Sequence, residues 1–435
     1  MSTTPTPAAT GSQTRDDGRW AVVILLFAGV VINYIDRGNL SVVAVPLMRD
    51  LGIAPAGMGM LLSAFFWTYA LCQIPAGYLT DRFGMKRMYA AGFLTWSLAS
   101  AATGLASGFG EVLALRMLLG VGEAVAIPAG MSYVRQRFRP EEQGFPTALF
   151  GSGAMVGPAL GVFLGAFLLD RTGWRPIFVL TGIGGCLWFL PWARFAPKGR
   201  IATAGAPNRP AGSAFPWRAL FRLRLTWAMT LGVFCYQYGF YFCLTWLPSY
   251  LVMARGFSFL NMGKFTGLPL LAMAAVSMLS GRLSDAAIAR HGRPLLVRKL
   301  FAGGGLLLAT SLASLLLIES NAAVLCALVA AFIGIGFAGP NYWAIAQLVS
   351  PEPVIGRVVG YVNTIGNIAG VCAPLVTGFL VGSSGNFHAS LLCAGGAMLI
   401  GSLMFLAGVR ERDTDALRNS ETRATAPCYD PVVTP

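Results

Sequence analysis

Long apolar segments alternate with short polar ones from residue 20 almost to the end of the chain. A membrane-spanning helix needs about 20 mostly apolar residues, and twelve segments reach roughly that length. Their limits are 20–42, 56–79, 87–107, 110–134, 145–169, 176–195, 225–252, 262–284, 299–318, 322–348, 355–382 and 387–409. Strands of a membrane barrel would be about ten residues long with alternating polarity. The pattern therefore predicts an all-α membrane protein with twelve transmembrane helices.

The polar stretch 196–224 is the longest between two spans, and it divides the twelve helices into two six-helix bundles. The bundles are expected at residues 20–195 and 225–409, with tails at 1–19 and 410–435. Lys and Arg gather in the central stretch and in every second polar segment, and such segments stay on the cytoplasmic side of a membrane. We therefore expect the central loop and both tails to be cytoplasmic.

Composition agrees with a protein that spans a membrane many times. Only 11% of the residues are charged, against about 25% in soluble proteins, and the mean hydropathy is +0.64. The net charge of +14 comes from residues between the spans, so it reports topology and does not predict a nucleic-acid partner. The content of Pro and Arg favours a bacterial inner membrane. A monomer is expected, because each twelve-helix unit contains its own pathway.

Few residues are suited to hold a metal or a cofactor. The two histidines, His291 and His388, lie in polar segments, and the eight cysteines form no C-x-x-C pair. Small buried side chains are the usual role of such cysteines. The sequence therefore predicts no metal site and no cofactor.

Four charged residues lie inside the apolar spans, namely Asp36, Arg37, Arg116 and Glu123. A charge at the centre of a bilayer costs about 2.5–3.5 kcal/mol on insertion scales, so it is rarely kept without a use. Arg116 and Glu123 are two helical turns apart and share a face. The side chains of Asp36 and Arg37 diverge by about 100°, so one faces the cavity and the other a neighbouring helix.

These four charges suit a site that binds an anion and a proton. The planar guanidinium of arginine makes two charge-assisted hydrogen bonds to a carboxylate and stays charged. A partly buried carboxyl group can carry a proton, and an anion that binds the arginine would release this acid from its partner. The alternative is a buried structural network that fixes how the helices pack.

The two halves of the chain share weak similarities. Gly77–Arg87 reads G-Y-L-T-D-R-F-G-M-K-R, and a degenerate copy, G-R-L-S-D, stands at Gly281–Asp285. Proline recurs in the fifth span of one half and its counterpart in the other, at Pro158 and Pro374. Such parallel duplication is typical of two-bundle transporters that bind substrate between the halves.

The pattern Gly77–Arg87 resembles the signature of the major facilitator superfamily, G-x-x-x-D-R-x-G-x-[RK]-[RK]. A finer resemblance is to its anion:cation symporter family, on N-Y-I-D-R-G-N-L-S at Asn33–Ser41, R-M-L-L-G-V-G-E at Arg116–Glu123 and W-L-P-S-Y-L at Trp246–Leu251. The resemblance implies the major facilitator fold and import of a small organic anion, usually with protons, across a lipid bilayer.

By matching position, the resemblance assigns residues to roles. The proton-coupling carboxylates would be Asp36 and Glu123. Substrate-binding residues would include Tyr34, Arg37, Tyr69, Arg116, Trp343 and Asn363. Separately, Asp81 and Asp285 lie beside bases at the cytoplasmic ends of helices, which favours a conformational gate over substrate contact. The residues of this gate would be Gly77, Asp81, Arg82, Gly84, Arg87 and Asp285.

Polar and aromatic residues in spans seven, ten and eleven are candidates to complete the site from the C-terminal half. They are Gln237, Tyr238, Tyr241, Asn341, Trp343, Gln347, Asn363 and Asn367. Asn363 and Asn367 are one turn apart on one helix face. Hydrogen bonds between helices explain each of these polar residues equally well.

Several functions stay open beside a proton-coupled importer. An anion exchanger or an exporter of the same superfamily is one, and the partial antiporter motif at Gly157, Pro158 and Gly161 keeps the exporter in view. A membrane-embedded enzyme would need a long loop with clustered acids or histidines, and no outward segment exceeds about 15 residues. A nutrient receptor would normally carry a long signalling tail. The sequence names neither the anion nor the coupling ion.

Overall fold

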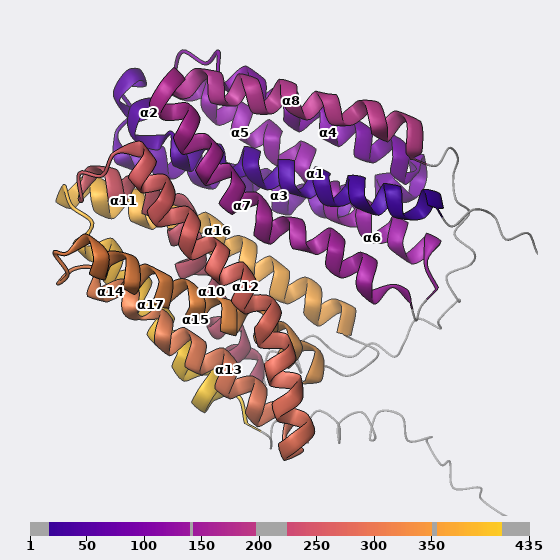
Figure 1. The fold of residues 1–435 in the computed structure, drawn as a ribbon, viewed down its shortest axis with the longest axis vertical. Coiled ribbons are helices and arrows are strands. Elements are labelled where there is room, and N and C mark those ends of the chain that lie inside the picture. Colours follow the sequence, from indigo (N-terminus) through magenta and orange to yellow (C-terminus); the bar gives the residue numbers. More distant parts are fainter. Residues whose placement is uncertain (1–16, 140–141, 197–223, 350–354, 411–435) are drawn as a thin grey trace, which may run out of the picture.

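The computed structural model describes residues 17–139, 142–196, 224–349 and 355–410, and these residues form helices and short connections. The N-terminal half contains α1 (Asp17–Val42), α2 (Ala44–Leu51), α3 (Pro55–Phe83), α4 (Met85–Thr103), α5 (Phe109–Glu123), α6 (Ala126–Arg137), α7 (Gly144–Thr172) and α8 (Trp174–Phe195). In Figure 1 these helices, coloured indigo to magenta, lie together as one half of the molecule.

The C-terminal half, coloured red to yellow in Figure 1, begins after the central stretch. It contains α10 (Arg224–Thr245), α11 (Leu247–Met253), α12 (Phe259–His291), α13 (Pro294–Ala309), α14 (Ser311–Ser314), α15 (Asn321–Leu348), α16 (Ile355–Ser384), α17 (His388–Leu403) and the π-helix η3 (Met404–Gly408).

Each expected span corresponds to one helix or to two consecutive helices. Ten helical segments among the described residues are long and apolar enough to cross a bilayer, and α4 and α10 occupy the other two expected spans. The fourth span is interrupted directly after Glu123, between α5 and α6, and the seventh is interrupted at Trp246, between α10 and α11. Both interruptions lie next to residues of the candidate site.

The two halves meet through α3 against α16 and α7 against α12. Glycines permit this approach near the end of the molecule that carries α2 and α11. A Cβ atom at Gly378 would lie only 2.7 Å from the carbonyl oxygen of Pro55, and one at Gly267 would lie 2.6 Å from the ring of Phe163. From this α2–α11 end, α7 and α12 diverge toward the opposite end (Figure 1).

The turn between α3 and α4 carries the first copy of the duplicated motif. Gly84 has φ +87°, a backbone conformation that side chains with a Cβ rarely adopt. Asp81, Arg82 and Arg87 are exposed around this turn. The glycine is thus explained by the sharp reversal of the chain at this helix junction.

Candidate functional site

Arg37 lies at the centre of the candidate site and pairs with Glu123 across two helices. Arg37 Nη2 donates to Glu123 Oε2 at 2.8 Å, and Nε donates to the same oxygen at 3.2 Å. Nη2 also lies 3.4 Å from the Asn33 side-chain oxygen, which accepts. Glu123 is fully buried, and the side chain of Arg37 is 12% exposed. A buried charge pair of this kind is costly to form and costly to break.

Three aromatic rings surround the Arg37 guanidinium. Its central carbon lies 4.5 Å from the ring centroid of Tyr34, 4.3 Å from that of Phe65 and 4.9 Å from that of Tyr69. The ring faces attract the cation and exclude water from it. This cage surrounds the guanidinium, although 12% of the Arg37 side chain remains exposed.

Arg116 brings a second buried guanidinium to the same place. Its Nη2 donates to the backbone oxygen of Arg37 at 3.5 Å, and the residue is 4% exposed. Among the described residues, Arg116 Nε and Glu123 Oε1 have no hydrogen-bond partner. Arg37 and Arg116 therefore face one carboxylate here, and the buried Asp36 supplies a second negative charge from another side of α1.

Asp36 points away from this cluster, although it is the neighbour of Arg37 in the chain. Its Oδ1 accepts a hydrogen bond of 2.8 Å from Ser100 Oγ on α4, and the residue is buried. Oδ2 has no partner in the described part of the chain. The two adjacent side chains thus contact different helices, α4 for Asp36 and α5 for Arg37, as the helical geometry predicts.

A small cavity opens beside Arg37 at the junction of the two halves. It is lined by Tyr34, Arg37, Gly38, Ser41, Leu62, Phe66, Arg116, Pro158, Val162, Tyr241, Leu244 and Thr245. The predicted residues Tyr34, Arg37, Arg116 and Tyr241 therefore share one cavity. Tyr241 comes from the C-terminal half, and its ring packs edge-on against Phe66 with centroids 4.7 Å apart.

Five other residues predicted to bind substrate are not among those that line this cavity, and one of them, Tyr69, packs against Arg37 as described above. Asn363 Nδ2 donates to Gln73 Oε1 at 3.1 Å, which links α16 to α3 across the two halves. Asn367 donates to the backbone oxygen of Asn363 at 3.1 Å. Gln237 is half-buried, and Trp343 packs beside Tyr342. Their roles in binding substrate stay predictions.

Sequence reasoning missed several residues of this site. Ser41 is the last residue of the first-span pattern, and Thr245 directly precedes the seventh-span pattern. The patterns therefore drew attention to these positions but assigned them no role. Phe65 and Gln73 lie on the same helix, α3, as the predicted Tyr69, but an aromatic or amide side chain in a span carries no distinctive signal. Only the packing of α3 against α1 and α16 reveals their contacts.

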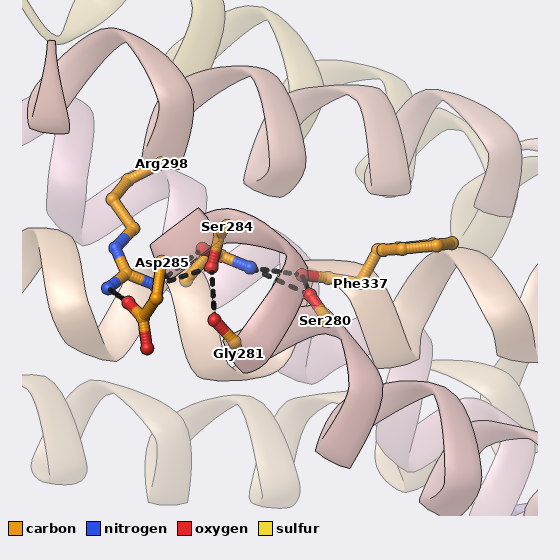
Figure 2. Close-up of polar contacts among 7 residues, drawn as sticks. Ser280, Gly281, Ser284, Asp285, Arg298 and Phe337 are labelled. Atoms are coloured by element: carbon orange, nitrogen blue, oxygen red, sulfur yellow. Dashed lines mark hydrogen bonds and ion pairs between the residues drawn. The ribbon is translucent and has the colours of Figure 1, made fainter. Parts of the chain in front are cut away.

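The second copy of the duplicated motif, Gly281–Asp285, takes part in a polar network within the C-terminal half (Figure 2). Arg298 pairs with Asp285 and donates from Nη1 to Ser284 Oγ at 2.6 Å and to Asn341 Oδ1 at 3.2 Å. Asn341 in turn donates to Ser280 Oγ at 2.9 Å. These contacts join α12, α13 and α15, so the buried Asn341 makes hydrogen bonds between helices.

Known proteins resemble this chain over most of its length. The model of the Major Facilitator Superfamily matches residues 26–374. A probable galactarate/D-glucarate transporter of Bacillus subtilis is 32% identical over 417 residues, which cover 89% of this chain and 91% of that protein. A D-galactonate transporter of Escherichia coli O6:H1 is 30% identical over 419 residues, which cover 89% of this chain and 95% of that protein.

Solved structures share the fold. A bacterial homologue of the human lysosomal transporter Spinster, in an inward-facing and unoccupied conformation, superposes with a TM-score of 0.73 at 22% identity, covering 94% of this chain and 95% of that one. The D-xylose–proton symporter gives a TM-score of 0.72 at 14% identity, and the superposition covers 91% of this chain and 99% of that one. The prediction of twelve transmembrane helices in two bundles is confirmed. The chain is a multi-pass membrane transporter that belongs to the major facilitator superfamily.

Proposed function

We propose that this protein imports an organic anion, a sugar acid or a related carboxylate, by proton symport through alternating access. The single observation that carries the proposal is the cluster of Arg37, Arg116 and Glu123 beside the cavity, with two guanidinium groups facing one carboxylate. The names of the relatives, galactarate/D-glucarate and D-galactonate transporters, support a sugar acid as the substrate class.

The substrate carboxylate would bind to Arg37 in competition with Glu123. Both hydrogen bonds from Arg37 to Glu123 end on one oxygen, Oε2, so an incoming carboxylate that takes the Nε and Nη2 edge of the guanidinium would free Glu123. A buried carboxylate without its cation is unfavourable, and protonation removes that cost. Binding of the anion thereby favours binding of a proton, which is the coupling that symport requires.

Asp36 would serve as a second proton site that substrate does not touch. It shares α1 with Arg37 but contacts Ser100 on the other side of the helix. Tyr34 and Tyr69 lie against Arg37, and Tyr241 lines the cavity with it, so the three would supply ring faces and hydroxyl groups to a sugar acid. Gln237, Trp343, Asn363 and Asn367 would join them from the C-terminal half after a movement of the two halves.

The packing of the halves supports an inward-facing state. They approach closely at the α2–α11 end and diverge toward the opposite end, where the exposed gate residues of α3 lie. We place the α2–α11 end outside and both tails inside, as the distribution of Lys and Arg predicts. A bacterial inner membrane and a monomeric transporter complete the proposal.

Uptake into proteoliposomes tests the function. A panel of labelled sugar acids, dicarboxylates and aromatic acids is offered under an inward proton gradient, an inward sodium gradient or no gradient. We expect accumulation of a sugar acid under the proton gradient alone. Exchange without any gradient-driven accumulation would replace the symporter by an exchanger or a facilitator, and accumulation under sodium would replace the coupling ion.

A further inference from the structure

Pro248 leaves a backbone oxygen of the seventh span without its usual donor. In a continuous helix the carbonyl of Leu244 would accept from the N–H of residue 248, and proline has no N–H. Two bonds of the same helical pattern are present nearby, because Trp246 N donates to Phe242 O at 2.9 Å and Tyr250 N donates to Trp246 O at 2.8 Å. The helical path therefore continues through the interruption, and Leu244 O needs a donor from elsewhere.

The hydroxyl of Ser41 in the other half of the molecule supplies this donor. Ser41 Oγ lies 2.6 Å from Leu244 O and 2.9 Å from Thr245 O. Ser41 is 3% exposed and lies one helical turn beyond Arg37 on the same face of α1. Two motifs singled out in the sequence, the end of the first-span pattern and the proline of the seventh-span pattern, thus meet across the two halves.

The junction of α10 and α11 is held firmly within its own half. Trp246 is fully buried, and its Nε1 donates to the Pro374 carbonyl of α16 at 3.1 Å. Thr245 Oγ1 donates to Tyr241 O at 2.6 Å on its own helix. Because these contacts stay inside the C-terminal half, the hydrogen bond from Ser41 is a link that must break when the halves separate here.

We propose that Ser41 is a positioning residue that closes the cavity at the α2–α11 end by bonding the backbone oxygen that Pro248 leaves free. Ser41, Leu244 and Thr245 line the cavity together with Arg37, so this bond forms part of the cavity wall. Opening at this end would expose Leu244 O to water, which replaces the serine. The proposal rests on the proposed alternating-access transport.

A double-mutant cycle tests the pairing of serine and proline. Spin labels are attached to Arg49→Cys and Ala254→Cys, two exposed positions on α2 and just after α11, in a background without native cysteines. The distance between the labels reports the ratio of closed to open molecules in lipid without substrate. Ser41→Ala should lower this ratio by about two- to tenfold, the effect of one lost hydrogen bond.

The second arm of the cycle uses Pro248→Ala, which restores an N–H four residues after Leu244. In that background Ser41→Ala should change the ratio less than in the native background, because Leu244 O then has a donor in its own helix. Ser63→Ala is the control, since Ser63 is equally buried but donates to Met60 O of its own helix at 2.9 Å. It should leave the ratio unchanged.

Two results would overturn the proposal. One is an effect of Ser41→Ala no larger than that of Ser63→Ala, which would make the serine a packing residue. The other is an equal effect of Ser41→Ala with and without Pro248, which would remove the link to the free carbonyl. The distances are measured without substrate, so a failure of the proposed anion transport would appear separately, in the uptake panel.

Discussion

Replacing Glu123 by Gln tests whether this carboxylate carries the coupled proton. Glutamine has nearly the same size and keeps an oxygen for Arg37 Nη2, which lies 2.8 Å from Glu123 Oε2 in the native pair. The amide takes up no proton at neutral pH. We therefore expect the variant to lose accumulation under a proton gradient, while counterflow of labelled anion between equal pools continues.

The structure also gives a magnitude for anion binding in this variant. A hydrogen bond to a charged group contributes about 1.5–3 kcal/mol, and the substrate no longer competes with a negative Glu123 for Arg37. Since about 1.4 kcal/mol is a factor of ten, the anion should bind about 10- to 100-fold more tightly. The substrate-free variant should unfold more easily than the native protein, because Arg37 and Arg116 are left buried without a carboxylate beside them.

Calorimetric titration with the transported acid and paired uptake and counterflow assays measure these effects. Glu111→Gln is the matched control, because Glu111 lies on the same helix but is exposed and hydrogen-bonded to Ser107. It should behave as the native protein in every assay. Equal loss of accumulation and counterflow in Glu123→Gln, or weaker anion binding, would refute the proposed competition for Arg37.

Three further variants test other parts of the structure. Arg37→Lys keeps the charge but loses the planar fork, so titration should show anion binding weakened by about 10- to 100-fold, or about 1.5–3 kcal/mol. Gly378→Val places a side chain about 2.7 Å from Pro55 O, so α3 and α16 should separate. Chemical labelling of cysteines introduced at the α2–α11 end should then rise. Gly396→Val is the control, because a Cβ atom there meets nothing within 4 Å, and it should leave the labelling unchanged. Asn341→Ala removes the buried partner of Arg298 and Ser280 and should lower the free energy of unfolding by about 1–3 kcal/mol in thermal denaturation, without changing anion binding.

The helices and one feature of the site could be predicted from the chain itself. Runs of about 20 apolar residues are a local property, so the spans follow from counting. The divergence of Asp36 and Arg37 follows equally from helical geometry, and the structure shows their side chains in contact with α4 and α5 respectively. Which of the two would face the cavity depends on how α1 packs against its neighbours, and that packing is not a local property.

The partners of the charged residues could not be predicted. Arg37 and Glu123 are 86 positions apart, and their pairing depends on the placement of α1 beside the end of α5. Asn341 had two equally good interpretations, and only its contacts with Arg298 and Ser280 show that it makes hydrogen bonds between helices. The lost donor at Pro248 is a local fact, but the identity of the replacement donor depends on how the two halves meet.

The most direct test of the account is to measure proton movement together with anion movement. Proteoliposomes that contain a pH-sensitive dye, with no imposed proton gradient and the membrane potential clamped, are given a labelled sugar acid. The account predicts that uptake acidifies the interior in step with the anion, and that this acidification is lost in Glu123→Gln. Uptake of the anion by the native protein with no change of internal pH would contradict symport.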